Sequence, residues 1–183
     1  MIINKSYEKN DTYFLAILPN ILFAQVCNTQ FTYTLDGFRT KADLTKDYII
    51  LELQGTNSKD NFSQLKSIFS KEVLNTKTVN IDDSTFVFGL QDAVKLSGVK
   101  PLTDMFYSVT ISCRDNLVKV QFNCKYFQSW YGMLGGGMTV MGSEFIYKKG
   151  KIKNEAAKVE AEKFANNFVK NLETKLRNGD NSW

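Results

Sequence analysis

Apolar and polar residues alternate along two long segments in the middle of the chain, with the period of two that is typical of half-buried β-strands. The apolar faces of these two segments are Tyr107, Val109, Ile111, Cys113 and Val118, Val120, Phe122, Cys124. A turn at Asp115-Asn116 would set each apolar residue of one strand opposite an apolar residue of the other, from the pair 113–118 to the pair 107–124. A slip of one residue would destroy this match, so the pattern predicts a hairpin with a defined register.

Two further segments predict strands that extend this hairpin into a sheet. Residues 47–54 (DYIILELQ) are rich in aliphatic residues and are followed by Gly55, which is typical of a buried strand. A second hairpin is predicted over residues 79–90. A loop from Asp82 to Thr85 would set Ile81 opposite Phe86 and Val79 opposite Phe88.

Apolar residues recur with helical spacing in two segments. Over residues 58–75 they form one stripe, and Ser58 is the expected N-cap. Over residues 154–177 they again form one stripe, with lysines and glutamates on the opposite face.

The elements follow one another as β-α-β-β-β-β-α, which predicts an α+β fold. We expect an antiparallel sheet of about five strands with two helices packed on one face, because this arrangement buries every apolar face. Residues 45–178 would form this single domain, and residues 179–183 a flexible tail. Residues 25–44 form a lead segment to which we assign no element.

The beginning of the chain has the order of an export signal. Lys5 and Lys9 precede the apolar run from Tyr13 to Ala24, which ends in a small residue suited to cleavage. Residues 1–24 are therefore expected to be a signal peptide, and the protein to be periplasmic or on the cell surface. Glu8, Asp11 and Pro19 depart from the usual pattern, and the alternative is an apolar first element of the domain. The residues before Cys27 do not resemble a lipid-attachment site, so we expect no lipid anchor. No apolar stretch reaches the length of about 20 residues that a bilayer requires, so we expect no membrane span.

Positive charge gathers near the end of the chain. The formal net charge is +4, while residues 148–177 contain nine Lys or Arg against four Glu. This segment either favours an anionic surface or forms the solvated side of a helix.

The residue types present exclude several kinds of chemistry. The chain has no histidine, which excludes Ser-His-Asp and Cys-His catalysis and zinc sites with histidine ligands. The glycines at 132–142 are followed by Ser143-Glu144 rather than by the Lys-Ser/Thr of a phosphate-binding loop. In the predicted hairpin Cys113 and Cys124 lie about 20 Å apart, at about 3.4 Å per residue, so they cannot form a disulfide. We therefore expect buried free thiols, no catalytic residue, no metal site and no cofactor.

One uncharged stretch, residues 126–143, has the composition of a binding surface. Aromatic and methionine side chains among glycines can adapt to a partner. The candidate binding residues are Tyr126, Trp130, Tyr131 and Met138. The alternative is that this segment packs across the sheet as part of the core.

Several short segments resemble a family of exported bacterial proteins, domain-of-unknown-function family 4468. They are Leu35-Asp36-Gly37-Phe38, Glu52-Leu53-Gln54-Gly55, Phe86-Val87-Phe88-Gly89, Tyr107-Ser108-Val109-Thr110-Ile111, and Asp115 with Val118-Lys119-Val120. The resemblance implies a TATA-binding-protein-like fold. It implies no catalytic residue, cofactor or substrate. Asn116 stands where the family usually has a glycine, which changes the turn and not the topology.

These observations favour an exported, non-catalytic module that binds a protein, a glycan or another envelope ligand. An envelope hydrolase that uses carboxylates or a Ser-Lys pair is the alternative. Nucleic-acid binding would rest on analogy of fold alone, so we expect no nucleic-acid partner. The oligomeric state does not follow from the sequence.

Overall fold

The computed structural model describes residues 30–69, 77–82, 85–131 and 136–179. Seven elements correspond to the predicted order: β3 Tyr48–Glu52, α1 Ser58–Phe69, β4 Lys77–Asp82, β5 Thr85–Leu96, β6 Leu102–Arg114, β7 Leu117–Tyr131 and α3 Glu155–Asn178. The strands form an antiparallel sheet in the order β3-β7-β6-β5-β4, and β8 (Gly136–Met141) pairs with β7 as a sixth strand. The predicted α+β class is confirmed. No helix of the described part combines the length and the apolar content needed to cross a bilayer.

The hairpin of β6 and β7 has the predicted register. Cys113 lies opposite Val118 and Tyr107 opposite Cys124, with every intermediate apolar pair as expected. Asn116 has a φ of 60° in the turn, a left-handed conformation that asparagine tolerates better than most residues. Apolar matching therefore defines the centre of the sheet.

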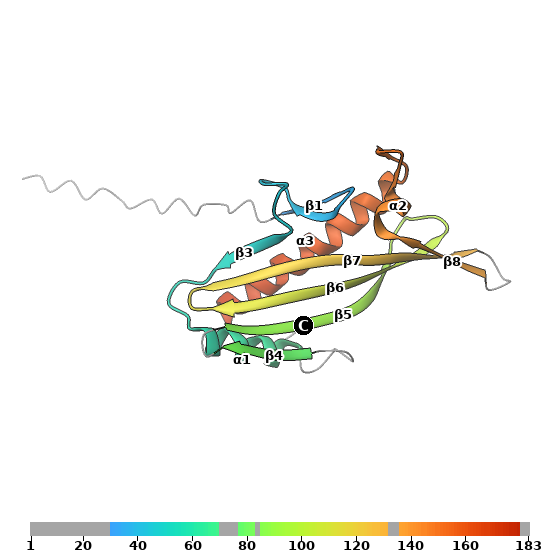
Figure 1. Ribbon diagram of the computed structural model, residues 1–183. Coiled ribbons are helices and arrows are strands. Elements are labelled where there is room, and N and C mark those ends of the chain that lie inside the picture. Colours follow the sequence, from blue (N-terminus) through green and yellow to red (C-terminus); the bar gives the residue numbers. More distant parts are fainter. Residues whose placement is uncertain (1–29, 70–76, 83–84, 132–135, 180–183) are drawn as a thin grey trace, which may run out of the picture.

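Both long helices lie behind the sheet, on the face that carries the apolar residues (Figure 1). The residues of β6 and β7 on this face are almost wholly buried: Thr103, Met105, Tyr107, Val109, Ile111, Cys113, Val118, Val120, Phe122, Phe127 and Ser129. Helix α1 adds Leu65, Ile68 and Phe69 to the core. Among the described residues, no helix lies over the other face of the sheet.

The predicted register of the β4–β5 hairpin is wrong by one residue. Asp82 pairs with Thr85, and a β-bulge between Asn80 and Asp82 places Asn80 opposite Phe86 and Thr78 opposite Phe88. The position of β5 is set instead by β6, with which it pairs from Phe86 to Leu96. The pairing with β6 determines the position of β5, because it involves many more residues than the pairing with the short edge strand β4.

The predicted N-cap of α1 is also wrong by one residue. Asn57 rather than Ser58 is the N-cap of α1, since its Oδ1 accepts a hydrogen bond of 2.8 Å from the amide of Asp60. The amide of Ser58 donates to Asp115 Oδ1 at 2.8 Å, which ties the helix to the β6–β7 turn. The last six residues of the predicted helix, 70–75, lie outside the described residues. Helix α3 begins at Glu155 after the N-cap Asn154, one residue later than the predicted start.

A hairpin that the sequence pattern did not predict lies within residues 25–44. There β1 (Phe31–Thr34) and β2 (Gly37–Thr40) form an antiparallel hairpin. Phe31, Tyr33 and Phe38 are 1–2% exposed and are among the largest fully buried side chains. The Phe38 ring meets the Phe122 ring of β7 edge to face, with 5.0 Å between centroids. The described part of the presumed lead segment, residues 30–44, therefore contributes to the core.

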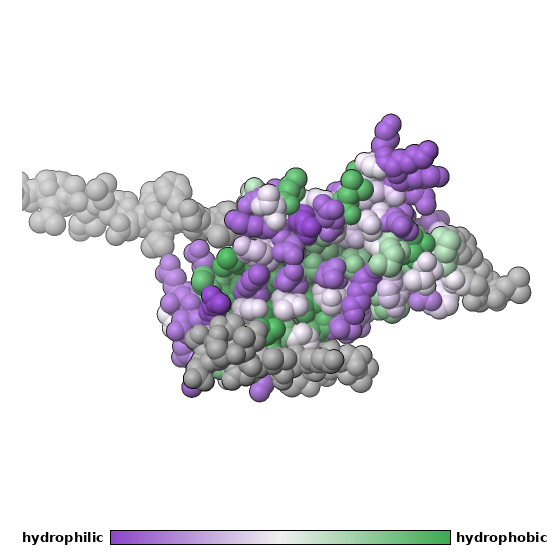
Figure 2. Space-filling model, viewed as in Figure 1, coloured by the Kyte–Doolittle hydropathy of each residue, from purple (hydrophilic) through white to green (hydrophobic). Residues whose placement is uncertain are grey.

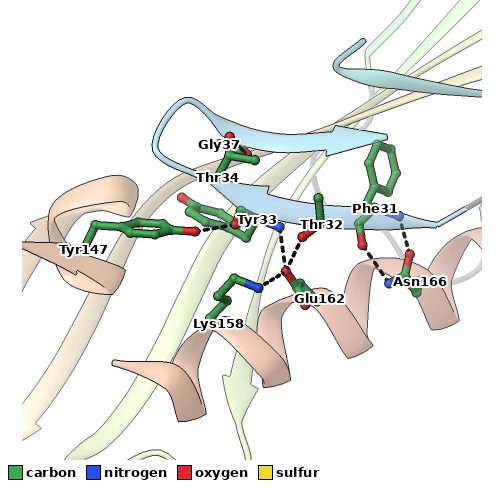
Figure 3. Close-up of polar contacts among 9 residues, drawn as sticks. All are labelled: Phe31, Thr32, Tyr33, Thr34, Gly37, Tyr147, Lys158, Glu162 and Asn166. Carbon is green, nitrogen blue, oxygen red and sulfur yellow. Dashed lines mark hydrogen bonds and ion pairs between the residues drawn. The ribbon is translucent and has the colours of Figure 1, made fainter. Parts of the chain in front are cut away.

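Side chains of α3 satisfy the backbone of β1 (Figure 3). The Asn166 amide accepts a hydrogen bond from the Phe31 N–H at 2.7 Å and donates one to the Phe31 carbonyl at 3.0 Å. Glu162 accepts from the Tyr33 N–H at 2.7 Å and from the Thr32 hydroxyl at 2.8 Å, and Lys158 pairs with the same carboxylate at 2.6 Å. The helix thus takes the place of a neighbouring strand, because backbone groups in a packed layer need partners.

Three short elements connect β8 to α3. They are α2 (Gly142–Ile146), β9 (Tyr147–Lys148) and β10 (Lys151–Ile152). A Cβ atom at Gly142 would overlap the hydroxyl of the buried Tyr33, so the close packing of α2 on β1 favours glycine. The Tyr147 hydroxyl donates to the Tyr33 carbonyl at 2.5 Å, which fastens the next strand to the same hairpin.

The two described cysteines are free, as predicted. Cys113 is buried and Cys124 half-buried. Burial raises the pKa of both thiols to about 12, which leaves almost no thiolate near neutral pH. They pack as small apolar residues. Cys27 lies outside the described residues.

We predict that Asn166→Ala lowers the free energy of unfolding by about 2 kcal/mol, because it removes both hydrogen bonds to Phe31. Asn167→Ala on the exposed side of the same turn is the matched control, since both changes raise helix propensity equally. Urea unfolding followed by circular dichroism measures the difference. Equal stability of the two variants would show that the backbone of β1 does not depend on Asn166.

Candidate binding surface

The open face of the sheet, which faces the viewer in Figures 1 and 2, is polar at its centre. Its central side chains are small or uncharged and are half-buried or exposed: Ser108, Thr110, Ser112, Gln121 and Asn123. Nothing in the described part of the chain covers these residues. The face changes character toward β8.

A β-bulge produces this change. The register of β6 and β7 shifts between Phe106 and Tyr107, so Tyr107 faces Cys124 while Phe106 faces Tyr126. One residue of β7, Lys125, has no partner across the pair, and the alternation of faces along β7 reverses there. Without the bulge Tyr126 would point into the core. With it, Phe127 is buried and Tyr126 lies on the open face.

The bulge gathers an aromatic patch in three adjacent rows across β6, β7 and β8. The patch consists of Phe106, Tyr126 and Met141, then Asp104, Gln128 and Thr139, then Leu102, Trp130 and Gly137. Leu102, Trp130 and Met141 are 48%, 40% and 62% exposed, and they gather in this one patch. In Figure 2 green and pale surface lies beside β8, while the centre of the face is mostly white and purple.

Trp130 is hydrogen-bonded at one end of its ring system and lies beside a glycine at the other. Its Nε1–H donates to Asp104 Oδ2 on β6 at 3.0 Å. The opposite edge lies beside Gly137 on β8, where an added Cβ would be 3.4 Å from Cε3 of the indole. The long axis of the indole therefore runs across the strands. Its polar edge is occupied, and its exposed side is free to stack on a ligand.

Phe106 and Tyr126 form the second aromatic element of the patch. Their rings are stacked, with centroids 4.5 Å apart and 20° between planes. Both side chains are half-buried. The middle row with Asp104 and Gln128 separates them from Trp130. Two residues along a strand span about 7 Å, so the row of hydrogen-bonding groups lies about 7 Å from the aromatic residues on either side of it.

The charges near the patch are few. Lys95 on β5 lies opposite Asp104 in the register of the sheet, and Lys125 donates to Gln91 Oε1 at 2.8 Å. Asp104 is the one carboxylate among the residues of the patch. No group of three or more His, Cys, Asp or Glu side chains within the described ranges could hold a metal ion. The arrangement can stack on and hydrogen-bond to a ligand.

The structure brings together two of the four predicted binding residues. Tyr126 and Trp130 share the patch. Met138 does not, because it lies opposite Ser129 and therefore on the other face of β8, where it is 45% exposed. Tyr131 ends β7, and its side chain lies outside the described part of the structure. Met141, opposite Tyr126, takes the place that was predicted for Met138.

Sequence reasoning missed Phe106, Asp104 and Leu102. The available signal was a phenylalanine next to the polar run Ser108, Thr110 and Ser112 on the same face of β6. A large apolar residue on such a face needs either a cover or a partner.

The comparisons with known proteins concern the fold. No model of a protein family and no curated protein matches the sequence. The chain is similar in structure to a TBP-like protein from Parabacteroides distasonis ATCC 8503, with 18% identity over 70% of this chain and 87% of that one, and a TM-score of 0.46. It is also similar to a DUF4468 family protein from Bacteroides ovatus ATCC 8483, with 11% identity over 73% and 85% of the two chains and a TM-score of 0.43. These two structures bear the same fold and family names as the resemblance noted in the sequence, and they give no information about the ligand.

We predict that Asp104→Ala releases the indole of Trp130 while changing the free energy of unfolding by less than about 1 kcal/mol, since the hydrogen bond is exposed. Time-resolved fluorescence anisotropy in a Trp183→Phe background should show faster motion of the indole. Asp92→Ala, an equal change of charge at an exposed position on β5, should leave this motion unchanged. Unaltered anisotropy in Asp104→Ala would mean that the packing beside Gly137 alone holds the ring.

Proposed function

We propose that the protein is an exported, non-catalytic binding module of the bacterial cell envelope, and that its ligand lies on the aromatic patch. The observation that carries the proposal is the hydrogen-bonded and exposed indole of Trp130. A side chain that is already held in place loses little conformational entropy on binding, so its stacking energy is retained as affinity.

The composition of the patch supports binding of an uncharged or weakly charged ligand. Trp130 and the Phe106–Tyr126 stack offer apolar ring faces, while Asp104, Gln128 and Thr139 offer hydrogen bonds between them. Tryptophan and tyrosine are enriched among the residues that dominate binding energy in interfaces. A glycan or a segment of an envelope protein fits this mixture.

The apolar run of residues 13–24 supports export. It lies outside the described residues, so the proposal rests there on the sequence pattern alone.

No observation favours the hydrolase over the binding module. The carboxylate of the patch, Asp104, already accepts the Trp130 N–H, and a hydrolase of this kind needs a second ionisable group beside it. Nucleic-acid binding likewise has no support beyond analogy of fold.

We predict that Trp130→Ala lowers retention of the protein on the insoluble envelope fraction of the producing cell by at least about tenfold, which is typical of a dominant contact residue. Co-sedimentation of purified protein with this fraction measures the effect. Ile50→Ala, which removes an apolar side chain that is 42% exposed at the β3 end of the sheet, is the control. Equal retention of Trp130→Ala, Ile50→Ala and the unmodified protein would remove the patch from the function.

Export is tested separately. Mass spectrometry of the protein recovered from the producing cell should find a mature chain that begins at Gln25, because cleavage follows Ala24. A chain that retains Met1 and is recovered from the cytoplasm would contradict the proposed location, whatever the patch binds.

A further inference from the structure

A short hairpin of lysines projects from the end of the molecule where β8 leads into α3, at the top right of Figures 1 and 2. We call residues 147–153 the lysine finger; it comprises β9, the turn at Lys149-Gly150, β10 and Lys153. Lys148, Lys149, Lys151 and Lys153 are all exposed. In the space-filling view the finger is the purple knob that stands clear of the sheet.

The positive charge of residues 148–177 is divided unequally between helix α3 and the finger. Helix α3 carries five Lys or Arg and four Glu, a net +1. The finger carries four Lys and no acidic residue, a net +4, which equals the formal net charge of the whole chain. The positive charge that the sequence assigned to the whole segment is therefore concentrated in seven residues. The solvated face of a helix accounts for little of it.

The geometry of the finger keeps like charges close together. Lys148 lies directly opposite Lys151, an arrangement that destabilises a strand pair. Lys149 has a φ of 50° in the turn, which residues other than Gly, Asn and Asp adopt less readily. Among the described residues, no ion pair involves a lysine of the finger, and the flanking Glu144 and Glu155 form none with it.

The base of the finger is nevertheless firmly attached. The Tyr147 hydroxyl donates to the Tyr33 carbonyl, and the Lys153 amide donates to the Ile146 carbonyl at 2.7 Å. The fold thus holds four like charges in a projecting position. An anionic partner would relieve their repulsion, and the preformed hairpin would lose little entropy when it binds.

We propose that the lysine finger docks on the anionic headgroups of a phospholipid bilayer. A convex knob fits a broad charged surface, whereas a polymer strand is normally held in a groove. Ile152 supports this choice, because it is 48% exposed among the lysines and can enter the boundary between headgroups and acyl chains. Lysines beside it keep their ammonium groups at the headgroups while their stems follow the apolar layer.

The size of the effect is measurable. A basic residue near an anionic bilayer contributes about fivefold to the partition coefficient. The removal of two finger lysines should therefore weaken binding about 25-fold. The attraction should disappear in about 1 M salt, where the screening length falls to about 3 Å.

Sedimentation with lipid vesicles tests the proposal on the protein as recovered from the producing cell. The unmodified protein should bind vesicles of phosphatidylglycerol and phosphatidylcholine at low salt and should not bind vesicles of phosphatidylcholine alone. Lys148→Gln with Lys151→Gln removes the opposed pair and should bind about 25-fold more weakly. Because this change relieves repulsion, thermal unfolding should show a fold at least as stable.

Lys59→Gln with Lys170→Gln is the matched control, since it removes the same charge from exposed positions on α1 and α3. It should bind nearly as tightly as the unmodified protein. Equal losses in the two double variants would show a diffuse effect of net charge and overturn the proposal. Failure of the unmodified protein to bind anionic vesicles, or binding to soluble polyphosphate without binding to vesicles, would also overturn it. An Ile152→Ala variant that binds like the unmodified protein would overturn the insertion of Ile152.

Discussion

The packing of the first hairpin on α3 is the contact on which the rest of the structure depends. A two-stranded hairpin on its own is marginally stable, and β1 has a strand partner on one side only among the described residues. Asn166 and Glu162 satisfy its other edge, which allows Phe31 and Tyr33 to enter the core without unpaired backbone groups. Gly142 of α2 packs on the same hairpin, and Tyr147 of β9 donates a hydrogen bond to it.

This contact explains why one face of the sheet is covered and the other is open. The hairpin, α1 and α3 occupy the same side, so the apolar residues of β6 and β7 are buried there. The bulge beside Phe106 then reverses the alternation in β7 without disturbing that core. Phe127 continues the buried face, and Tyr126 and Trp130 pass to the open one. A single unpaired residue in a strand thus creates the aromatic patch.

The aromatic patch and the lysine finger lie at the same end of the molecule, because β8 and α2 lead directly from one to the other (Figure 1). They differ in chemistry. The patch has apolar ring faces with a row of hydrogen-bonding groups, while the finger is a projecting group of like charges around Ile152. Contacts of stacking type are insensitive to salt, whereas those of the finger are screened by it. The two surfaces can therefore be studied independently in one protein.

The sequence by itself determined the α+β class, the order of the central elements and the register from Cys113–Val118 to Tyr107–Cys124, because strict alternation allows one pairing that buries every apolar residue. The composition of residues 126–143 also indicated Tyr126 and Trp130 as candidate binding residues. Only the tertiary structure decided the role of Phe31 and the faces of Tyr126 and Met138. The partners of Phe31 lie more than a hundred residues away on α3, and a bulge leaves no periodic signal. Local patterns record which residues avoid water, whereas contacts distant in sequence decide where they go.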